Sequence, residues 1–243
     1  MAILLFTDFG HDDPYVGQME AAIERAAPGV KVIHLLHSAP AFNVRASAHL
    51  LAALIEHLPS GHTVCGVVDP GVGSERRGMI LFAQGNWFVG PDNGLFSVIA
   101  ARAHVPRLWH LPPASRELSA SFHGRDLFAP LAAAIAAGRF PEESSPDGDS
   151  LDVEFGAGDL FEIIYVDHYG NCHTGIRGSG ASGEARLVVK GRELRYARVF
   201  AAVPLGAAFW YENSEGLVEI AVNRGSAANL LALEVGEPVG WNT

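Results

Sequence analysis

The chain has 243 residues, of which 49% are hydrophobic, so it can bury one large core or two smaller ones and is not disordered. Its net charge is -10 and its longest basic cluster is Arg76-Arg77, which argues against binding to nucleic acid or to an anionic membrane. Cys65 and Cys172 form no C-x-x-C pair, which argues against a zinc site or a disulfide framework. We expect a cytoplasmic protein, because the N-terminus enters a strand-like run without a basic leader and no apolar run is long enough to span a bilayer.

Strand-like apolar runs alternate with helical patterns through the first 137 residues. The runs with the length and pattern of strands are 3–7, 30–36, 63–68, 79–83 and 87–89. The segments with helical periodicity are 15–27, 44–58, 94–103 and 127–137. This β-α-β-α-β order predicts an α/β fold in which a mostly parallel sheet carries helices on both faces.

The composition changes to Pro, Glu, Ser, Asp and Gly after residue 138, which is typical of a linker. We therefore predict an N-terminal domain at 1–140, a linker at 141–158 and a C-terminal domain at 159–243. Short strand-like runs without a clear long helix follow the linker, at 161–166, 185–190, 193–200, 217–222 and 228–235. Their spacing predicts a smaller antiparallel β domain.

Candidate site residues follow two of the predicted strands. Asp69 comes directly after the apolar run 63–68, and open α/β sheets place their ligand crevices at the carboxyl ends of such strands. Asp8 follows the first strand, where it can either accept two hydrogen bonds from a ribose diol or cap the next helix. Arg76 can keep a nearby carboxylate ionised, and His123 titrates near neutral pH. Taken singly, Asp69, Arg76 and His123 more often form a structural ion pair and a surface histidine than a catalytic site.

Four motifs in order identify a family. They are Thr-Asp-Phe-Gly-His-Asp-Asp-Pro-Tyr-Val-Gly at 7–17, Asp-Pro-Gly-Val-Gly-x-x-Arg at 69–76, Phe-His-Gly-Arg-Asp at 122–126 and Asp-His-Tyr-Gly-Asn at 167–171. Together they resemble the S-adenosyl-L-methionine hydroxide adenosyltransferases, hydrolase relatives of the fluorinase and chlorinase enzymes. The resemblance implies hydrolysis of S-adenosyl-L-methionine to adenosine and L-methionine without a cofactor. It also implies a β-barrel-like C-terminal domain and a homotrimer whose sites lie between subunits.

The resemblance also implies roles for individual residues. Asp69, Arg76 and His123 match the catalytic triad, although the sequence leaves open whether His123 takes the proton or only orients the nucleophile. The other matching positions in the N-terminal domain concern the substrate: Asp8 holds the ribose hydroxyls, Asp13 faces the methionine moiety, and Phe42, Phe122 and Gly124 lie around the ribose and the reacting carbon.

In the C-terminal domain the resemblance implies contacts to both ends of the substrate. Asp167 matches the residue that binds the methionine ammonium, and Asn171 the one that binds adenine. Ser214 and the backbone of Glu215 match the segment that holds the methionine carboxylate. Phe200 and Arg224 are candidates for the adenine pocket.

Three other functions remain open from the sequence. A halogenase would attack the same carbon with halide, but halogenating relatives carry an aromatic residue at the position of Asp69, and fluorinating ones a serine at Gly124. A metal-dependent phosphohydrolase would use His11, Asp12, Asp13 and Asp69, although Asp-Asp-Pro before a helix is also a common helix start. The third function is non-catalytic binding of an adenosyl ligand. We expect no metal, since the remaining histidines show no ligand spacing.

Overall fold

The computed structural model describes residues 1–112, 118–140 and 150–242. These residues form two compact units, Met1–Ala48 with Leu58–Ala157, and His49–His57 with Gly158–Thr243. Part of the predicted linker, 141–149, lies outside the described residues, whereas residues 150–157 belong to the first unit. The predicted domain limits therefore stay a prediction, and each unit is described below by itself.

The first unit is built on a six-stranded sheet in the order β2-β1-β3-β5-β4-β6. Its strands are β1 (Ile3–Thr7), β2 (Val32–Leu36), β3 (Thr63–Val67), β4 (Gly78–Ala83), β5 (Asn86–Pro91) and β6 (Arg107–His110). β2, β1, β3 and β5 run parallel, while β4 is antiparallel to both of its neighbours. The predicted mostly parallel sheet is confirmed.

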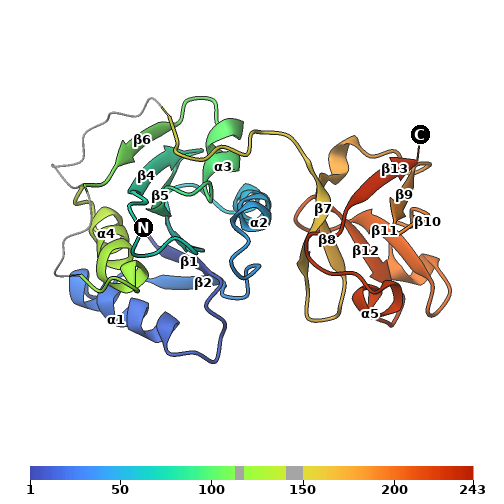
Figure 1. Ribbon diagram of the computed structural model, residues 1–243, viewed down its shortest axis with the longest axis horizontal. Coiled ribbons are helices and arrows are strands. Elements are labelled where there is room, and N and C mark those ends of the chain that lie inside the picture. The colour runs from blue at the N-terminus through green and yellow to red at the C-terminus, as the bar shows by residue number, and fades with distance from the viewer. Residues whose placement is uncertain (113–117, 141–149, 243) are drawn as a thin grey trace. The chain divides into compact units, whose positions relative to one another are not determined.

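Helices cover both faces of this sheet, as predicted (Figure 1). The helices are α1 (Tyr15–Ala26), α3 (Ser97–Arg102), α4 (Ala129–Ala136), which a π-helical turn, Gly124–Phe128, precedes, and the start of α2 (Val44–Glu56), whose residues from His49 on belong to the second unit. α1 and α4 lie side by side on one face, where Ile3 and Leu5 of β1 share a core with Met19 and Ala133. α3 and the start of α2 lie on the other face.

The chain order places two aspartates at one edge of the sheet. β1 lies between β2 and β3, so the connection that leaves β1 runs to one side of the sheet, to β2, and the connection that leaves β3 runs to the other side, to β4. Thr7 is paired with Val67, and Asp8 and Asp69 therefore follow adjacent parallel strands at the same end. After Asp69 the loop passes Gly73 (φ 80°), where an added Cβ would lie 2.4 Å from the carbonyl oxygen of Ala120. Glycine at this position lets the loop approach the segment that leads to His123.

The second unit is an antiparallel β structure, as predicted. Its strands are β7 (Leu160–Val166), β8 (Cys172–Arg177), β9 (Arg186–Val189), β10 (Arg192–Leu194), β11 (Ala208–Glu212), β12 (Leu217–Val222) and β13 (Val239–Asn242). They form sheets in the orders β10-β9-β13 and β11-β12-β8-β7. Single bridges, Glu162 to Pro238 and Tyr196 to Trp210, join the two sheets at both edges. The resulting closed arrangement around one apolar core is barrel-like.

Some local predictions in this unit are wrong. The run 228–235 is not a strand, because α5 (Ala227–Leu231) occupies it; Ser226 caps the helix by accepting from the amide of Asn229 at 3.1 Å, and Ala232 ends it at φ 54°. The run 193–200 is a strand only to Leu194, and Phe200 begins a 3₁₀ turn. β8, β11 and β13 of this unit, and β6 of the first unit, were not predicted, since they are short or carry polar residues.

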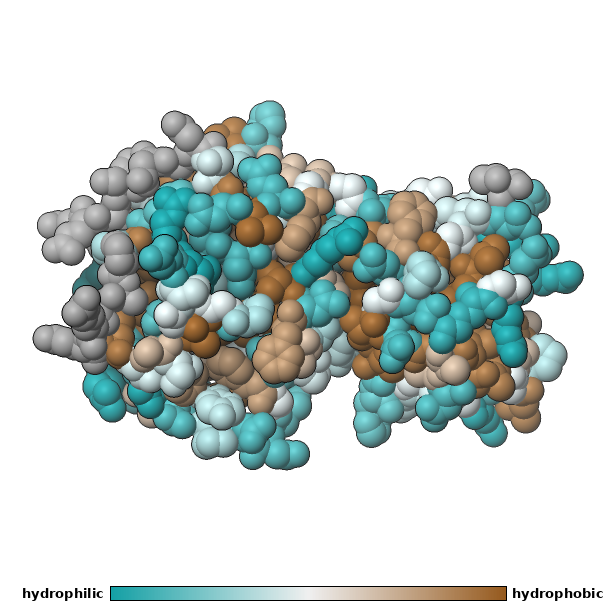
Figure 2. Space-filling model, viewed as in Figure 1, coloured by the Kyte–Doolittle hydropathy of each residue, from teal (hydrophilic) through white to brown (hydrophobic). Residues whose placement is uncertain are grey.

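Polar and apolar residues alternate over the face drawn in Figure 2. Large apolar side chains that are exposed include Phe42 (77%) in the first unit and Tyr169 (75%) and Leu205 (70%) in the second. Within the described ranges, no helix has both the length and the apolar character that crossing a bilayer requires.

Candidate active site

Asp69, Arg76 and His123 form one hydrogen-bonded group beyond the carboxyl end of β3. Nη2 of Arg76 donates to Oδ2 of Asp69 at 2.5 Å and lies 3.2 Å from Nδ1 of His123. Nη1 of Arg76 donates to the carbonyl of Arg77 at 2.9 Å, and its guanidinium lies 5.4 Å from the ring centre of Phe128. The Asp69 side chain is only 5% exposed. The structure thus brings together the three residues that were predicted to be catalytic.

Burial and charge shift the titration of this group. Burial raises the pKa of Asp69, and the ion pair with Arg76 opposes the increase. Burial also lowers the pKa of His123, and repulsion by the Arg76 guanidinium lowers it further. His123 is therefore a neutral imidazole near neutral pH.

The contact with Arg76 also determines the tautomer of His123. A guanidinium only donates hydrogen bonds, so Nδ1 of His123 is the acceptor and the ring proton is on Nε2. Oδ1 of Asp69 and Nε of Arg76 are buried without a hydrogen-bond partner among the described residues. The backbone amide of Gly71 faces the Asp69 carboxylate and lowers its pKa. Oδ1 is thus an acceptor that remains available to a bound molecule.

A small aromatic pocket of about 170 Å³ adjoins Asp69 and His123. Phe9, Tyr15 and Phe122 line it with ring centres 5.5 to 5.7 Å apart, packed edge to face or tilted. Gly124 also lines the pocket, and a Cβ there would lie 3.3 Å from the Phe122 ring. Phe122 and Gly124, which were predicted to lie around the ribose and the reacting carbon, thus line the pocket beside Asp69 and His123. The sequence analysis missed Phe9 and Tyr15 as site residues, although both belong to the first motif.

The other predicted residues of the first unit lie outside this pocket. Oδ2 of Asp8 accepts a hydrogen bond from the amide of Phe42 at 3.0 Å, and burial raises the pKa of Asp8. The Phe42 side chain is exposed at a backbone φ of 60°. Asp13 is exposed, and it forms no group of three potential metal ligands with His11 and Asp12 in the described part of the chain.

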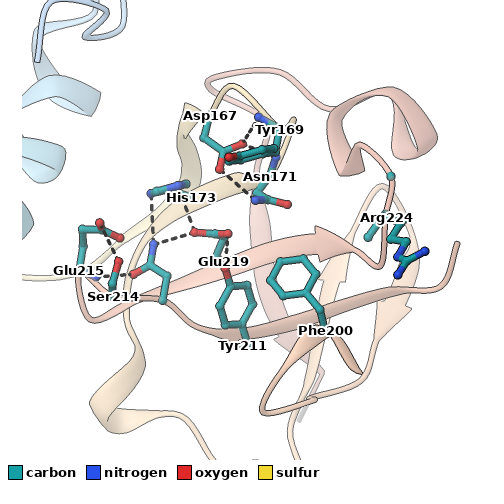
Figure 3. Close-up of a pocket in the computed structure, with 13 residues that line it drawn as sticks. Asp167, Tyr169, Asn171, His173, Phe200, Tyr211, Ser214, Glu215, Glu219 and Arg224 are labelled. Atoms are coloured by element: carbon teal, nitrogen blue, oxygen red, sulfur yellow. Dashed lines mark hydrogen bonds and ion pairs between the residues drawn. The ribbon is translucent and has the colours of Figure 1, made fainter. Parts of the chain in front are cut away.

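The second unit has a larger pocket, of about 730 Å³, over the sheet β11-β12-β8-β7 (Figure 3). All six residues that were predicted to bind substrate in this domain line it: Asp167, Asn171, Phe200, Ser214, Glu215 and Arg224. Asp167 is held in place because its carboxylate accepts from the side chain and amide of Asn171 at 2.9 and 2.8 Å. Ser214 donates to Oε1 of Glu215 at 2.9 Å. The Glu215 amide, expected to face a substrate carboxylate, donates instead to Oδ1 of Asn213 at 3.1 Å.

The pocket also contains polar residues that the sequence analysis missed, chiefly His173, Asn213 and Glu219. Glu219 is 3% exposed, and its position as a lone acid in the apolar strand β12 was a usable signal. Asp167, His173 and Glu219 offer ligand atoms within 4.8 Å of one another, the one such group found among the described residues. Each of these side chains is already hydrogen-bonded inside the unit.

Comparison with known proteins gives the same family as the motifs. Family models described as the SAM hydroxide adenosyltransferase N-terminal and C-terminal domains match residues 3–145 and 161–240. The chain is 39% identical to an (R)-S-adenosyl-L-methionine hydrolase of Thermus thermophilus, with 98% of each chain covered. It is 36% identical to a hydrolase of the same name from Salinispora arenicola, covering 95% of this chain and 94% of that protein. A fluorinase of an Actinoplanes strain is 25% identical, covering 96% and 95%.

Two solved structures share the fold over nearly the whole chain. An uncharacterized conserved protein from Thermotoga maritima superposes with a TM-score of 0.87 at 30% identity, covering 99% of this chain and 100% of that one. A conserved hypothetical protein from Thermus thermophilus gives 0.77 at 36% identity, covering 99% of both. Motifs, family models and fold agree, and the chain belongs to the SAM hydroxide adenosyltransferase family.

Proposed function

We propose that this chain hydrolyses S-adenosyl-L-methionine to adenosine and L-methionine. The observation that carries the proposal is the buried Asp69–Arg76–His123 group beside an aromatic pocket, in a chain 39% identical to a protein named for this reaction. The name of the relatives specifies the R epimer, and we extend that preference to this chain.

The chemistry requires a positioned water and little else. The oxygen of water attacks C5′ as the C5′–S bond breaks, and the electron pair of that bond leaves on sulfur, which becomes a neutral thioether. No acid is needed at the leaving group, so we propose that neither a metal nor an organic cofactor takes part. Holding water in line with the C–S bond can contribute about 7 to 11 kcal/mol to the rate enhancement.

The geometry suggests a division of work between Asp69 and His123. Oδ1 of Asp69, buried and without a partner among the described residues, accepts the proton of the attacking water. Nε2 of His123 carries a proton and donates a hydrogen bond to the oxygen of the attacking water. Arg76 holds both side chains and keeps Asp69 ionised. His123 thus orients the nucleophile and does not take its proton.

The same carboxylate disfavours halide. At an effective dielectric of 20, two like charges 4 Å apart repel by about 4 kcal/mol, so an anion beside Asp69 is less stable than neutral water. The 25% identity to a fluorinase indicates a related protein and does not specify the nucleophile. Asp69 favours water in that role.

We assign substrate-binding roles on the same basis. In the first unit Asp8 accepts from the ribose diol, Asp13 faces the methionine moiety, and Phe42 lies near the ribose. In the second unit the roles follow the lining of the larger pocket: Asp167 for the ammonium, Ser214 for the carboxylate, Asn171 for adenine, with Phe200 and Arg224 beside it.

We further propose a homotrimer in which the first unit of one subunit and the second unit of its neighbour complete each site. The division of the proposed residues between two units and the exposure of Phe42 and Tyr169 support it. Asp69→Ala and Asn171→Ala proteins, each inactive alone, should regain part of the activity after mixed dissociation and reassembly. Full activity in a monomeric sample by light scattering contradicts shared sites.

The proposed function is tested with each sulfur epimer of S-adenosyl-L-methionine in ¹⁸O-labelled water, with and without chloride, bromide or fluoride. Mass spectrometry should find one labelled oxygen in adenosine and none in methionine, with or without chelator. A 5′-halogenated nucleoside as the main product supports the halogenase instead. Activity lost on chelation and restored by one metal favours the metal-dependent phosphohydrolase, and binding without turnover favours the non-catalytic protein.

A further inference from the structure

Three side chains from neighbouring strands form a polar row on the outer face of the sheet β11-β12-β8-β7. Val218 and Ile220 of β12 pack into the apolar core, so Glu219 between them points to the opposite face. Tyr211 of β11 and His173 of β8 are paired with Glu219 across the strands. A carboxylate this buried requires donors around it.

Glu219 receives those donors from three directions (Figure 3). The Tyr211 hydroxyl donates to Oε1 at 2.5 Å, and the Asn213 amide nitrogen donates to Oε2 at 2.8 Å. Nε2 of His173 lies 3.1 Å from Oε2. Burial and the Glu219 carboxylate both raise the pKa of Tyr211, which therefore stays a protonated donor.

The proton positions in this network follow from the contacts. The Asn213 amide nitrogen also lies 3.2 Å from Nδ1 of His173 and can only donate to it. His173 therefore carries its proton on Nε2, which faces Glu219. Each donor in the group meets an acceptor, and such closed polar networks hold their members rigidly.

Asn213 connects this network to the turn between β11 and β12. Its Oδ1 accepts from the amides of Glu215 and Leu217 at 3.1 and 2.9 Å, so the side chain closes the turn on itself. Ser214 lies within that turn, on the rim of the pocket. The orientation of Asn213, and with it the position of Ser214, depends on the acceptor that Glu219 provides.

We propose that Glu219 is a positioning residue for the carboxylate of the amino-acid part of the substrate. It acts through Asn213, holding turn 213–217 so that the Ser214 hydroxyl meets that carboxylate in place of Oε1 of Glu215. The inference rests on the proposed function, since it takes S-adenosyl-L-methionine as the substrate. Metal binding by Asp167, His173 and Glu219 is the competing explanation, and it would require His173 to give up the proton on Nε2 and Glu219 to release Asn213.

The test compares S-adenosyl-L-methionine with its decarboxylated analogue, which lacks only the carboxylate. We expect Glu219→Ala to lower the kcat/KM ratio of substrate to analogue about tenfold, mainly through KM, because the turn loses its support. Glu219→Gln should keep the ratio within about threefold, since its amide oxygen can accept from Asn213 and His173 while its nitrogen donates to Tyr211. Thr174→Val is the matched control: it removes a buried 2.7 Å hydrogen bond to the Val218 carbonyl, between the same strands and away from the pocket.

A folded Glu219→Ala protein with the parent kcat/KM ratio overturns the proposal. The proposal also fails if Glu219→Gln lowers the ratio as much as Glu219→Ala does, or if Thr174→Val does so. If Glu219→Ala does not fold, the test uses Asn213→Asp. The carboxylate introduced at position 213 still accepts from the turn amides but repels Glu219. The kcat/KM ratio of Asn213→Asp should be low at pH 8. It should recover toward pH 5, where the protonated aspartic acid can donate to Glu219. A ratio at the parent value across this range contradicts the role of Asn213.

Calorimetry separates this proposal from the proposed function. If the parent protein forms no adenosine, the proposed hydrolysis is contradicted. The positioning role of Glu219 can still be tested then, by measuring the binding of L-methionine and of adenosine. Glu219→Ala should weaken L-methionine binding about tenfold and leave adenosine binding unchanged. Equal loss for both ligands, or stoichiometric Zn²⁺ binding to the parent that Glu219→Ala abolishes, overturns the positioning role.

Discussion

The 3.2 Å contact between Nη2 of Arg76 and Nδ1 of His123 leaves the imidazole only one way to carry its proton. Because the guanidinium donates to Nδ1, Nε2 is protonated and available as a donor. Burial and the same guanidinium lower the pKa of His123, which keeps the ring neutral. The contact therefore makes His123 a donor to the nucleophile and leaves Asp69 as the acceptor of its proton.

His123→Gln should retain more activity than His123→Ala, since a glutamine amide can still donate near the position of Nε2. A general base typically contributes about 10²- to 10⁴-fold, and a base at His123 would be lost equally in both variants. Single-turnover rates measure the difference. Equal rates for the two variants contradict the donor role.

Substitution of Asp8 should chiefly affect ligand binding, and substitution of Arg76 should chiefly affect the rate of the chemical step. Asp8→Ala removes the proposed acceptor of the ribose diol and should weaken adenosine binding by about 1.5 to 3 kcal/mol. Arg76→Ala should lower kcat far more than it lowers adenosine affinity, because Arg76 holds Asp69 and His123. Calorimetry and single-turnover rates on the same samples check both, and an Arg76→Ala protein with the parent rate removes the catalytic assignment.

The rate should depend on pH through Asp69. Its raised pKa places the loss of kcat on acidification above the ordinary value of 3.8, because the reaction needs the ionised carboxylate. His123, with its lowered pKa, should add no inflection near 6.5. The kcat profile between pH 4 and 9 tests this, and an inflection near 6.5 that His123→Gln removes would show that protonation of His123 controls the rate.

Stability should fall on acidification because of His37. This histidine is 2% exposed, contacts Thr7 at 2.9 Å and His34 at 2.8 Å, and faces the ring of His11 at 5.5 Å, while Glu20 lies 3.6 Å from His34. Burial, with repulsion by His34 and His11, lowers its pKa to about 4.

The sign follows from proton binding. Between pH 6.5 and about 4 the unfolded chain binds a proton at His37 that the folded protein does not, so stability present above pH 6.5 is lost as the pH falls, by up to about 3 kcal/mol. Denaturant unfolding of the parent and of His37→Gln measures this. The variant should show a smaller pH dependence, and His104→Gln, at an exposed histidine, should match the parent. Identical pH profiles for the parent and His37→Gln rule out the assignment.

Gly124→Ser should fold and should not convert the enzyme into a halogenase. A Cβ at Gly124 comes no closer than 3.3 Å to the Phe122 ring and 3.5 Å to Met19 and Phe9, which small side-chain movements can relieve. Asp69 remains and still repels halide. Product analysis in molar chloride should find only adenosine, at a reduced rate, and a chlorinated product would show that Asp69 does not decide the nucleophile.

The sequence by itself determined the main features of the first unit. Short continuous apolar runs in it alternate with segments of helical periodicity, so the parallel sheet, the helices on both faces and the position of Asp69 after β3 followed from local patterns. Four motifs in order were enough to identify the family, because their residues carry the chemistry and keep their spacing. The second unit was predicted less well, since strands such as Cys172–Arg177 are short and contain polar residues.

Only the tertiary structure decided how side chains pair across the chain. Arg76 and His123 are 47 residues apart in sequence, and no local pattern reports that one donates to a particular nitrogen of the other. Glu219 in an apolar strand could be recognised as unusual, but its donors come from β8, β11 and the 213–217 turn. Hydrogen bonds depend on distance and direction between atoms brought together by folding, and a sequence pattern records only which residues are present.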